Sequence, residues 1–223
     1  MKPGHKALAA FAVVTATASL FFHLQSVAFI GSNVHALVAA LFLFVPPFLR
    51  KERDDGLTTR PYGLNAALVL AGLASLPLYA GLYILFHRQV CPQLSLAALC
   101  VKLPPFHLRL PPHFFRLTAA QLLVVALPEE YFFRGYMQTQ LETLWPPVRR
   151  WFGMPLGKAW LCTALLFGLG HFLVTFDPLM LSRAIPGLVF GYMFARTRSI
   201  VPGLIFHAGC NLLMEILAVS FPK

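Results

Sequence analysis

Long apolar runs constrain the fold of this sequence more than any other feature. The run from Ala7 to Ile30 contains no Lys, Arg, Asp or Glu, and a transmembrane helix needs about 20 mostly apolar residues. Only 12% of the whole chain is charged, against about 25% in a typical soluble domain. Together these properties predict an integral, multi-pass membrane protein, and we expect the first run to remain as an uncleaved span.

Short polar or proline-containing breaks separate about seven such spans. Two of these breaks are GSN at 31–33 and the pair Asp177-Pro178. Because no repeat, linker or soluble domain is visible, we predict an all-α fold, a polytopic membrane helical bundle of about seven transmembrane helices in one domain, 1–223. The expected spans are Ala7–Ile30, Val34–Leu49, Tyr62–Phe86, Leu117–Leu144, Ala159–Phe176, Leu179–Ala195 and Ile200–Phe221.

The region between the third and fourth spans has a different composition. Its sequence LPPFHLRLPPHFFR at 103–116 is basic and rich in proline, and proline cannot continue a helix. We therefore predict an interfacial or re-entrant segment near 89–115, held by aromatic and basic side chains.

Charge and cysteine content limit the classes of binding partner and of metal or redox motif that the sequence indicates. The net charge of +10 lies mostly between the apolar runs, so the lipid bilayer, with its anionic headgroups, explains it better than nucleic acid does. None of the four cysteines forms a CxxC pair, so a zinc or redox motif of that type is not indicated. Cys162 and Cys210 lie in apolar runs, whereas Cys91 and Cys100 could pair in an extracytoplasmic loop.

The sequence PEEYFFRG at 128–135 places three charges inside the fourth span. Each charge at the bilayer centre costs about 2.5–3.5 kcal/mol, so pairing or function must retain them. Glu130 and Arg134 are four residues apart, and we predict that they form an ion pair on one helix face. Glu129 points about 100° away from that face. Pro128 should bend the helix there. Irregular backbone at membrane depth is tolerated where it lines a water-filled cavity, and a carboxylate beside such a cavity is suited to act as a general base.

Two later spans carry further polar residues. His171 ends the sequence FGLGH, in which Gly168 and Gly170 allow close helix approach, and His207 and Asn211 lie one turn apart in HAGCN. Polar side chains in lipid face the bundle interior, so we expect them to converge with Glu129. Such a group could hydrolyse a bond: Glu129 with one histidine takes a proton from water, while Asn211 and the other histidine donate to an oxyanion.

These motifs resemble the CPBP (Abi) family of glutamate-type intramembrane endopeptidases, and the sequence is similar to type II CAAX prenyl endopeptidases. PEEYFFRG resembles the EExxxR motif, and FGLGH resembles FxxxH. A third block runs from Pro186 to Asn211. It is formed by Pro186, Gly187, Gly191, Arg196, Thr197, Ser199, Ile200, Pro202, His207 and Asn211. The resemblance covers a catalytic core at about 117–215, and the spans in 1–116 are divergent.

The resemblance implies a role for each motif residue. It implies that Glu129 and His171 activate water and that His207 and Asn211 stabilise the oxyanion. Glu130 and Arg134 would support the site. It also implies no cofactor, and a membrane-anchored protein or peptide as substrate, cleaved near its C-terminus. That substrate would be a CAAX-like protein, a bacteriocin-type peptide or a C-terminal sorting anchor of the myxosortase kind, in a bacterial or archaeal cell membrane. The oligomeric state is left open.

Several other interpretations of the same residues remain open. A zinc-dependent protease would use Glu129, His171 and His207 as ligands, although no HExxH motif is present. A non-catalytic immunity or binding protein could keep the same fold. A bis-histidine haem protein would leave Glu129 and Asn211 unexplained, and a proton-coupled transporter would predict inverted repeats.

Overall fold

The computed structural model describes residues 2–49, 57–90, 93, 104–147, 149–151 and 154–221. Three helices precede residue 90: α1 (Pro3–His23), α2 (Ala28–Leu49) and α3 (Tyr62–Leu85), which continues into the π-helical turn η1 (Phe86–Val90). The later helices are α7 (Lys158–Thr175), the 3-10 helix η5 (Pro178–Arg183), α8 (Ala184–Thr197) and α9 (Val201–Ser220). Between these two groups lies one composite helix, the central helix, built from α4 (Phe114–Ala120), η3 (Gln121–Ala126), α5 (Leu127–Glu130), η4 (Tyr131–Gln138) and α6 (Thr139–Glu142).

The helices confirm the predicted polytopic bundle. In the described part of the chain, six helical stretches are long and apolar enough to cross a membrane. The central helix adds a seventh stretch, which alternates between short α and π segments. The protein is therefore an integral, multi-pass membrane protein. The outer surface agrees, because large apolar side chains such as Phe48 and Phe115, each 86% exposed, point away from the bundle.

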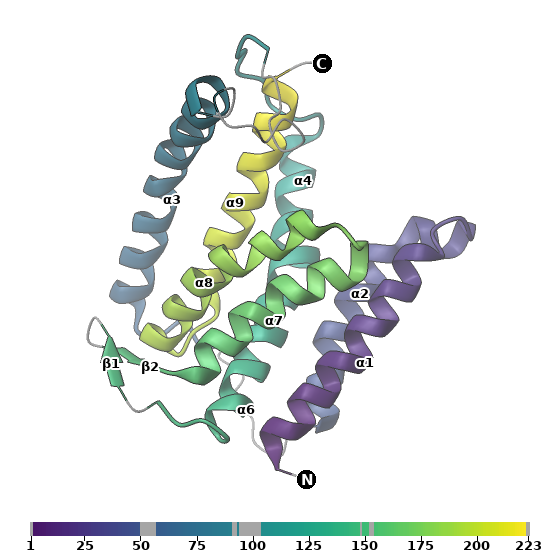
Figure 1. Cartoon of the computed structure of the whole chain (residues 1–223), viewed down its shortest axis with the longest axis vertical. Helices are drawn as coiled ribbons and strands as arrows, with labels where there is room; N and C mark the ends of the chain where they lie inside the picture. Colours follow the sequence, from purple (N-terminus) through teal and green to yellow (C-terminus); the bar gives the residue numbers. More distant parts are fainter. Residues whose placement is uncertain are drawn as a thin grey trace.

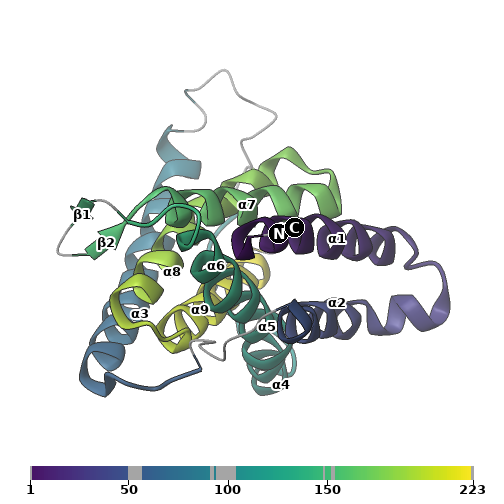
Figure 2. The ribbon, with the colours of Figure 1, turned by 90° about the horizontal axis from the view of Figure 1, so that it is seen from below.

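The central helix passes through the middle of the molecule. Seen from below in Figure 2, α1 and α2 lie on one side of it, and α3, α8 and α9 lie on the other. Figure 1 shows α7 and α8 crossing in front of it, with α3 at the outer edge beside α9. The central helix, which carries the three predicted charges, therefore packs against α1, α2, α7, α8 and α9, whereas α3 packs mainly against α9.

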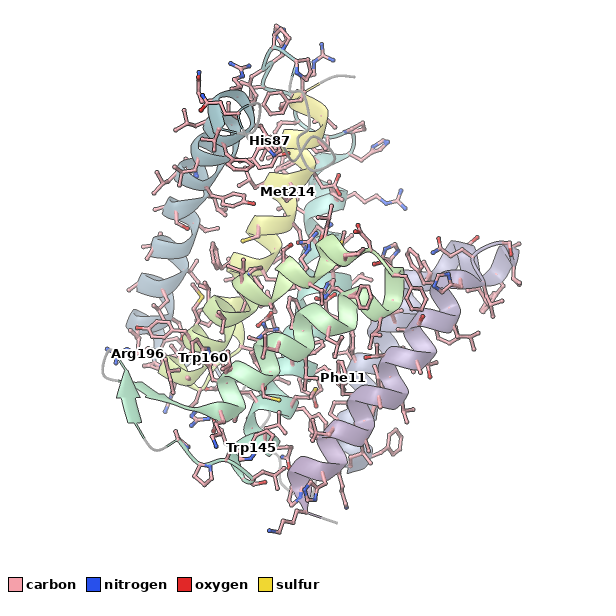
Figure 3. The ribbon with its side chains drawn as sticks, viewed as in Figure 1. Phe11, His87, Trp145, Trp160, Arg196 and Met214 are labelled. Atoms are coloured by element: carbon pink, nitrogen blue, oxygen red, sulfur yellow. The ribbon has the colours of Figure 1, made fainter. Side chains whose placement is uncertain are left out.

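Aromatic side chains fill the core where these helices meet. Phe132, Phe133 and Tyr136 of the central helix are buried, and Phe133 makes an edge-on contact with Phe167 of α7 at 5.0 Å between ring centres. Phe11 of α1, labelled in Figure 3, contacts the same Phe133 ring at 6.3 Å. Edge-to-face aromatic packing of this kind fixes the helices around the charged segment.

The predicted break between the first two spans was wrong. We expected GSN at 31–33 to separate them, but the turn lies at 24–27 and α2 already begins at Ala28. Ser32 and Asn33 instead donate side-chain hydrogen bonds of 2.8 Å to the carbonyls of Ala28 and Phe29 in their own helix. Small polar residues are compatible with an intramembrane helix when they bond its backbone in this way.

Pro128 lies at a change of helical register. The N–H of Leu127 donates to the Leu122 carbonyl, five residues back, and π-helical turns stand on both sides of the proline. Because proline has no N–H to donate, the wider turns redirect the bonding around it, and π-turns of this kind are frequent at functional sites. They lie beside Glu129 and Glu130.

Two smaller features complete the fold. A two-stranded antiparallel hairpin, β1 (Arg149–Trp151) and β2 (Met154–Leu156), is the only strand pair in the described residues and adds to the predicted all-α fold. Within the predicted interfacial segment, the N–H of His107 donates to the Ser220 carbonyl at 3.0 Å, so this stretch contacts the end of α9. Cys91 and Cys100, the possible disulfide pair, lie outside the described residues.

Candidate active site

Glu130 and Arg134 form the predicted ion pair at the centre of the bundle. Arg134 Nη1 lies 3.1 Å from Glu130 Oε1, and both side chains are fully buried. Arg134 also donates from Nη2 to the Gly187 carbonyl at 3.1 Å. Its guanidinium lies 4.5 Å from the centre of the Phe167 ring and 5.2 Å from that of Phe190. This pair therefore ties the central helix to α7 and α8.

Glu129 points away from that pair and toward the two histidines. Its Oε2 lies 3.8 Å from His171 Nε2 and 3.7 Å from His207 Nε2. These distances are too long for direct hydrogen bonds, and Oε2 is buried without a hydrogen-bond partner among the described residues. The predicted convergence of these three side chains is therefore confirmed.

A backbone contact fixes the protonation of His171. Its Nδ1 lies 2.8 Å from the Phe167 carbonyl oxygen, and a carbonyl can only accept, so Nδ1 carries the proton. In the neutral ring, Nε2 then presents its lone pair toward Glu129. Gly168 holds this part of α7 close to the next segment, because a Cβ there would lie 2.6 Å from the Leu181 carbonyl oxygen. The expected close helix approach at this glycine is confirmed.

His207 is held by Glu130. Its Nδ1 lies 3.1 Å from Glu130 Oε1, and its ring stacks on Phe190 with 4.8 Å between centres and 13° between planes. Gly203, one turn earlier on α9, makes this approach possible, since a Cβ there would lie 2.8 Å from Glu130 Oε2. Glu130 thus holds both Arg134 and His207, a link that the helical spacing alone did not predict.

Asn211 contacts Gln121, which was not among the predicted site residues. Its Nδ2 donates to Gln121 Oε1 at 2.9 Å. Gln121 lies on the central helix, about two turns before Glu129, so both residues reach the same side of that helix. A polar residue at this spacing inside an apolar run was the signal that could have identified it.

Two cavities meet at Glu129 and His171. The larger, the polar cavity, has a volume of about 320 Å³ and contains Glu129, His171, His207, Asn211 and Gln121. The smaller, the apolar cavity, has a volume of about 110 Å³ and is lined by residues of α1, α2, α7 and the central helix. Besides Glu129 and His171, the lining residues are Thr15, Ala18, Val38, Phe42, Phe133, Gly170, Val174 and Thr175. Glu129 therefore lines both cavities.

Other residues of the third block shape the turn between α8 and α9. Thr197 donates from Oγ1 to the Met193 carbonyl at 2.9 Å and accepts from the Ser199 N–H at 3.1 Å. Ser199 also bonds the carbonyl of Thr58, just before α3. These contacts set the start of α9 and hence the height of His207 in the bundle.

The groups brought together at this centre are the carboxyl group of Glu129, the two imidazoles and the amide of Asn211. Among the described residues, no group of three His, Cys, Asp or Glu side chains has the arrangement of a metal site.

Comparison with known families gives a match over this part of the chain. The family described as type II CAAX prenyl endopeptidase Rce1-like matches residues 111–213, the stretch that contains all six predicted site residues. The match confirms the resemblance seen in the three motifs and supports a CAAX-type intramembrane endopeptidase in general. No curated protein and no solved structure matches the chain.

Proposed function

Because residues 111–213 carry the Rce1-like match, we propose that this protein is an intramembrane endopeptidase of a bacterial or archaeal cell membrane. Its substrate is a membrane-anchored protein or peptide, cleaved near its C-terminus. One observation carries the proposal: Glu129 Oε2 lies within 3.8 Å of the Nε2 atoms of both histidines, in a cavity that also contains Asn211.

Glu129 is the proposed general base. It takes one proton from a water molecule, and the oxygen of that water bonds to the scissile carbonyl carbon. His171 accepts a hydrogen bond from the same water at Nε2, because its Nδ1 is already protonated against the Phe167 carbonyl. When the carbon–nitrogen bond breaks, the proton held by Glu129 goes to the departing amine. General base catalysis of this kind contributes about 10²–10⁴-fold.

Asn211 and His207 are the proposed donors to the oxyanion. Asn211 uses one N–H toward Gln121, which leaves its second N–H for the substrate. His207 can donate from Nε2 only when both ring nitrogens are protonated, because its Nδ1 faces Glu130. Each donor contributes about 10²–10³-fold to turnover.

The reaction needs no metal ion in this proposal. Arg134 already places a buried positive charge beside Glu130, which disfavours a second cation nearby. Elemental analysis of the purified protein, with activity measured after exhaustive chelation and zinc add-back, tests this point. We expect substoichiometric zinc and unchanged turnover. Stoichiometric zinc with chelation-sensitive activity would make Glu129, His171 and His207 ligands.

The substrate can be identified directly in membranes. Proteomes from cells with the wild-type protein and with Glu129→Gln are compared for new protein C-termini. We expect a small set of shortened, membrane-anchored proteins or peptides that depend on Glu129. Their sequences distinguish CAAX-like proteins from bacteriocin-type peptides and sorting anchors, and identical sets of C-termini in both strains would refute proteolysis.

A further inference from the structure

Arg183 places a positive charge in the polar cavity. It is the last residue of η5, is half-buried, and lines this cavity together with Glu129 and Asn211. Its neighbours along the wall include Pro186, Cys210 and Met214, of which Met214 is labelled on α9 in Figure 3. Neither the motifs nor the proposed chemistry gives this arginine a role.

Arg183 also lacks an anionic partner. Across the described ranges it makes no ion pair and no side-chain hydrogen bond, whereas Arg134 pairs with Glu130 and Arg198 pairs with Glu142. Glu215 lines the same cavity but is exposed and not within ion-pair distance. A guanidinium that is partly desolvated without a counter-ion is costly. The polar cavity therefore has an unused positive charge at its wall.

A carboxylate fits this position best. Guanidinium groups bind carboxylates through two parallel N–H···O bonds, and such charge-assisted pairs are among the strongest in proteins. Under the proposed function, on which this inference rests, the substrate brings its own C-terminal carboxylate close to Glu129. We propose that Arg183 binds the terminal α-carboxylate of the substrate, so that the enzyme selects free C-termini and cleaves a short distance upstream of them.

A lipid phosphate would offer similar anionic oxygens, so the test separates the two sources. The probes are two internally quenched peptides in liposomes, each with an S-prenylated cysteine and three further residues. They differ only at the C-terminus, which is a free carboxylate in one and an amide in the other. Each is assayed with wild type, Arg183→Met, Arg183→Lys and the control Arg116→Met, whose exposed arginine on α4 lies outside the cavity.

We expect wild type to prefer the carboxylate peptide by about 10- to 100-fold in kcat/KM, the range for one charge-assisted pair. Arg183→Met should lose this preference by cleaving the carboxylate peptide more slowly, with the amide peptide unchanged. Arg183→Lys should keep part of it, and Arg116→Met should match wild type. An unchanged preference in Arg183→Met, or an equal loss on both peptides as expected for a lipid or packing role, would overturn the assignment.

Binding to the Glu129→Gln variant separates this inference from the proposed function. Fluorescence anisotropy with the same two peptides measures recognition without turnover. Tighter binding of the carboxylate peptide, abolished by adding Arg183→Met, supports the carboxylate site even if wild type fails to cleave. Equal binding of both peptides overturns it, even if cleavage occurs.

Discussion

The C-terminal part of the chain and the helices before it build the active site in different ways. Within 111–213, which carries the family match, side chains make direct polar contacts, such as those of Glu130 with Arg134 and His207. The earlier helices α1 and α2 contribute mostly apolar or small walls, for example Ala18 and Val38, and His35 of α2 is a polar exception that lines the polar cavity. Charged networks tolerate little change, because each buried group needs its partner. Apolar walls tolerate volume changes and can vary with the substrate.

The largest effect should come from Glu129→Gln. This change removes the base while keeping the shape of the side chain, so we expect turnover to fall by about 10²–10⁴-fold. Because Glu129 has no ion pair with Arg134, the melting temperature should stay near that of wild type. Peptide cleavage and thermal unfolding are measured on the same preparation.

Glu130→Gln is the matched comparison. It leaves Arg134 without its partner and weakens the contact with His207, and breaking a buried pair typically costs about 3–5 kcal/mol. We therefore expect lower thermal stability as well as lower activity. Normal turnover in Glu129→Gln, or wild-type stability in Glu130→Gln, would reverse the roles assigned to the two carboxylates.

Asn211→Ala should have the next largest effect. Loss of an oxyanion donor predicts a drop of about 10²–10³-fold in kcat with little change in KM or fold. Asn211→Asp should be at least as slow, since it places negative charge beside the oxyanion. Steady-state kinetics of both variants check this prediction. Higher activity of Asn211→Asp than of Asn211→Ala would make residue 211 a base or a ligand instead.

Gln121→Met should have a moderate effect. Methionine keeps the length of the side chain but accepts no strong hydrogen bond, so the Asn211 amide loses its orientation and kcat should fall about tenfold. The decisive readout is a double-mutant cycle, because Gln121→Met should cost nothing further when Asn211 is already alanine. Additive losses would show that Gln121 acts independently of Asn211.

The smallest effect is expected in the apolar walls. Val38→Ala enlarges the apolar cavity by two methyl groups, so we expect a change of roughly three- to tenfold in KM, with kcat retained. Val13→Ala on the exposed face of α1 is the control, because that side chain is 64% exposed. If Val38→Ala reduced kcat as strongly as Asn211→Ala, α2 would belong to the catalytic machinery.

The sequence predicted the polar contacts that follow from helical spacing and from the cost of charge in lipid. Glu130 and Arg134 share a face at i and i+4, and polar groups must face the interior, so both the ion pair and the convergence of Glu129 with the two histidines were predictable. Which partner each residue selects depends on helix packing. For this reason the contacts of His207 with Glu130 and of Asn211 with Gln121 appeared only in the structure.

The helix boundaries were less predictable than the site. GSN at 31–33 reads as a break, but Ser32 and Asn33 bond their own helix and the turn forms at 24–27. The π-helical turns around Pro128 were also not foreseen beyond a bend, because they depend on how the neighbouring helices hold the chain. Local residue preferences do not contain that information.

Isotope labelling distinguishes activation of water by Glu129 from direct attack of its carboxylate on the peptide bond. Purified protein in liposomes, in excess over a prenylated CAAX peptide, is allowed one turnover in ¹⁸O-labelled water, and both product and protein are analysed by mass spectrometry. If Glu129 activates water, we expect one ¹⁸O atom in the newly formed product carboxylate, none in Glu129, and product formation slowed by about 10²–10⁴-fold with Glu129→Gln. An unlabelled product carboxylate with ¹⁸O incorporated at Glu129, or cleavage by Glu129→Gln at the wild-type rate, would contradict this role of Glu129.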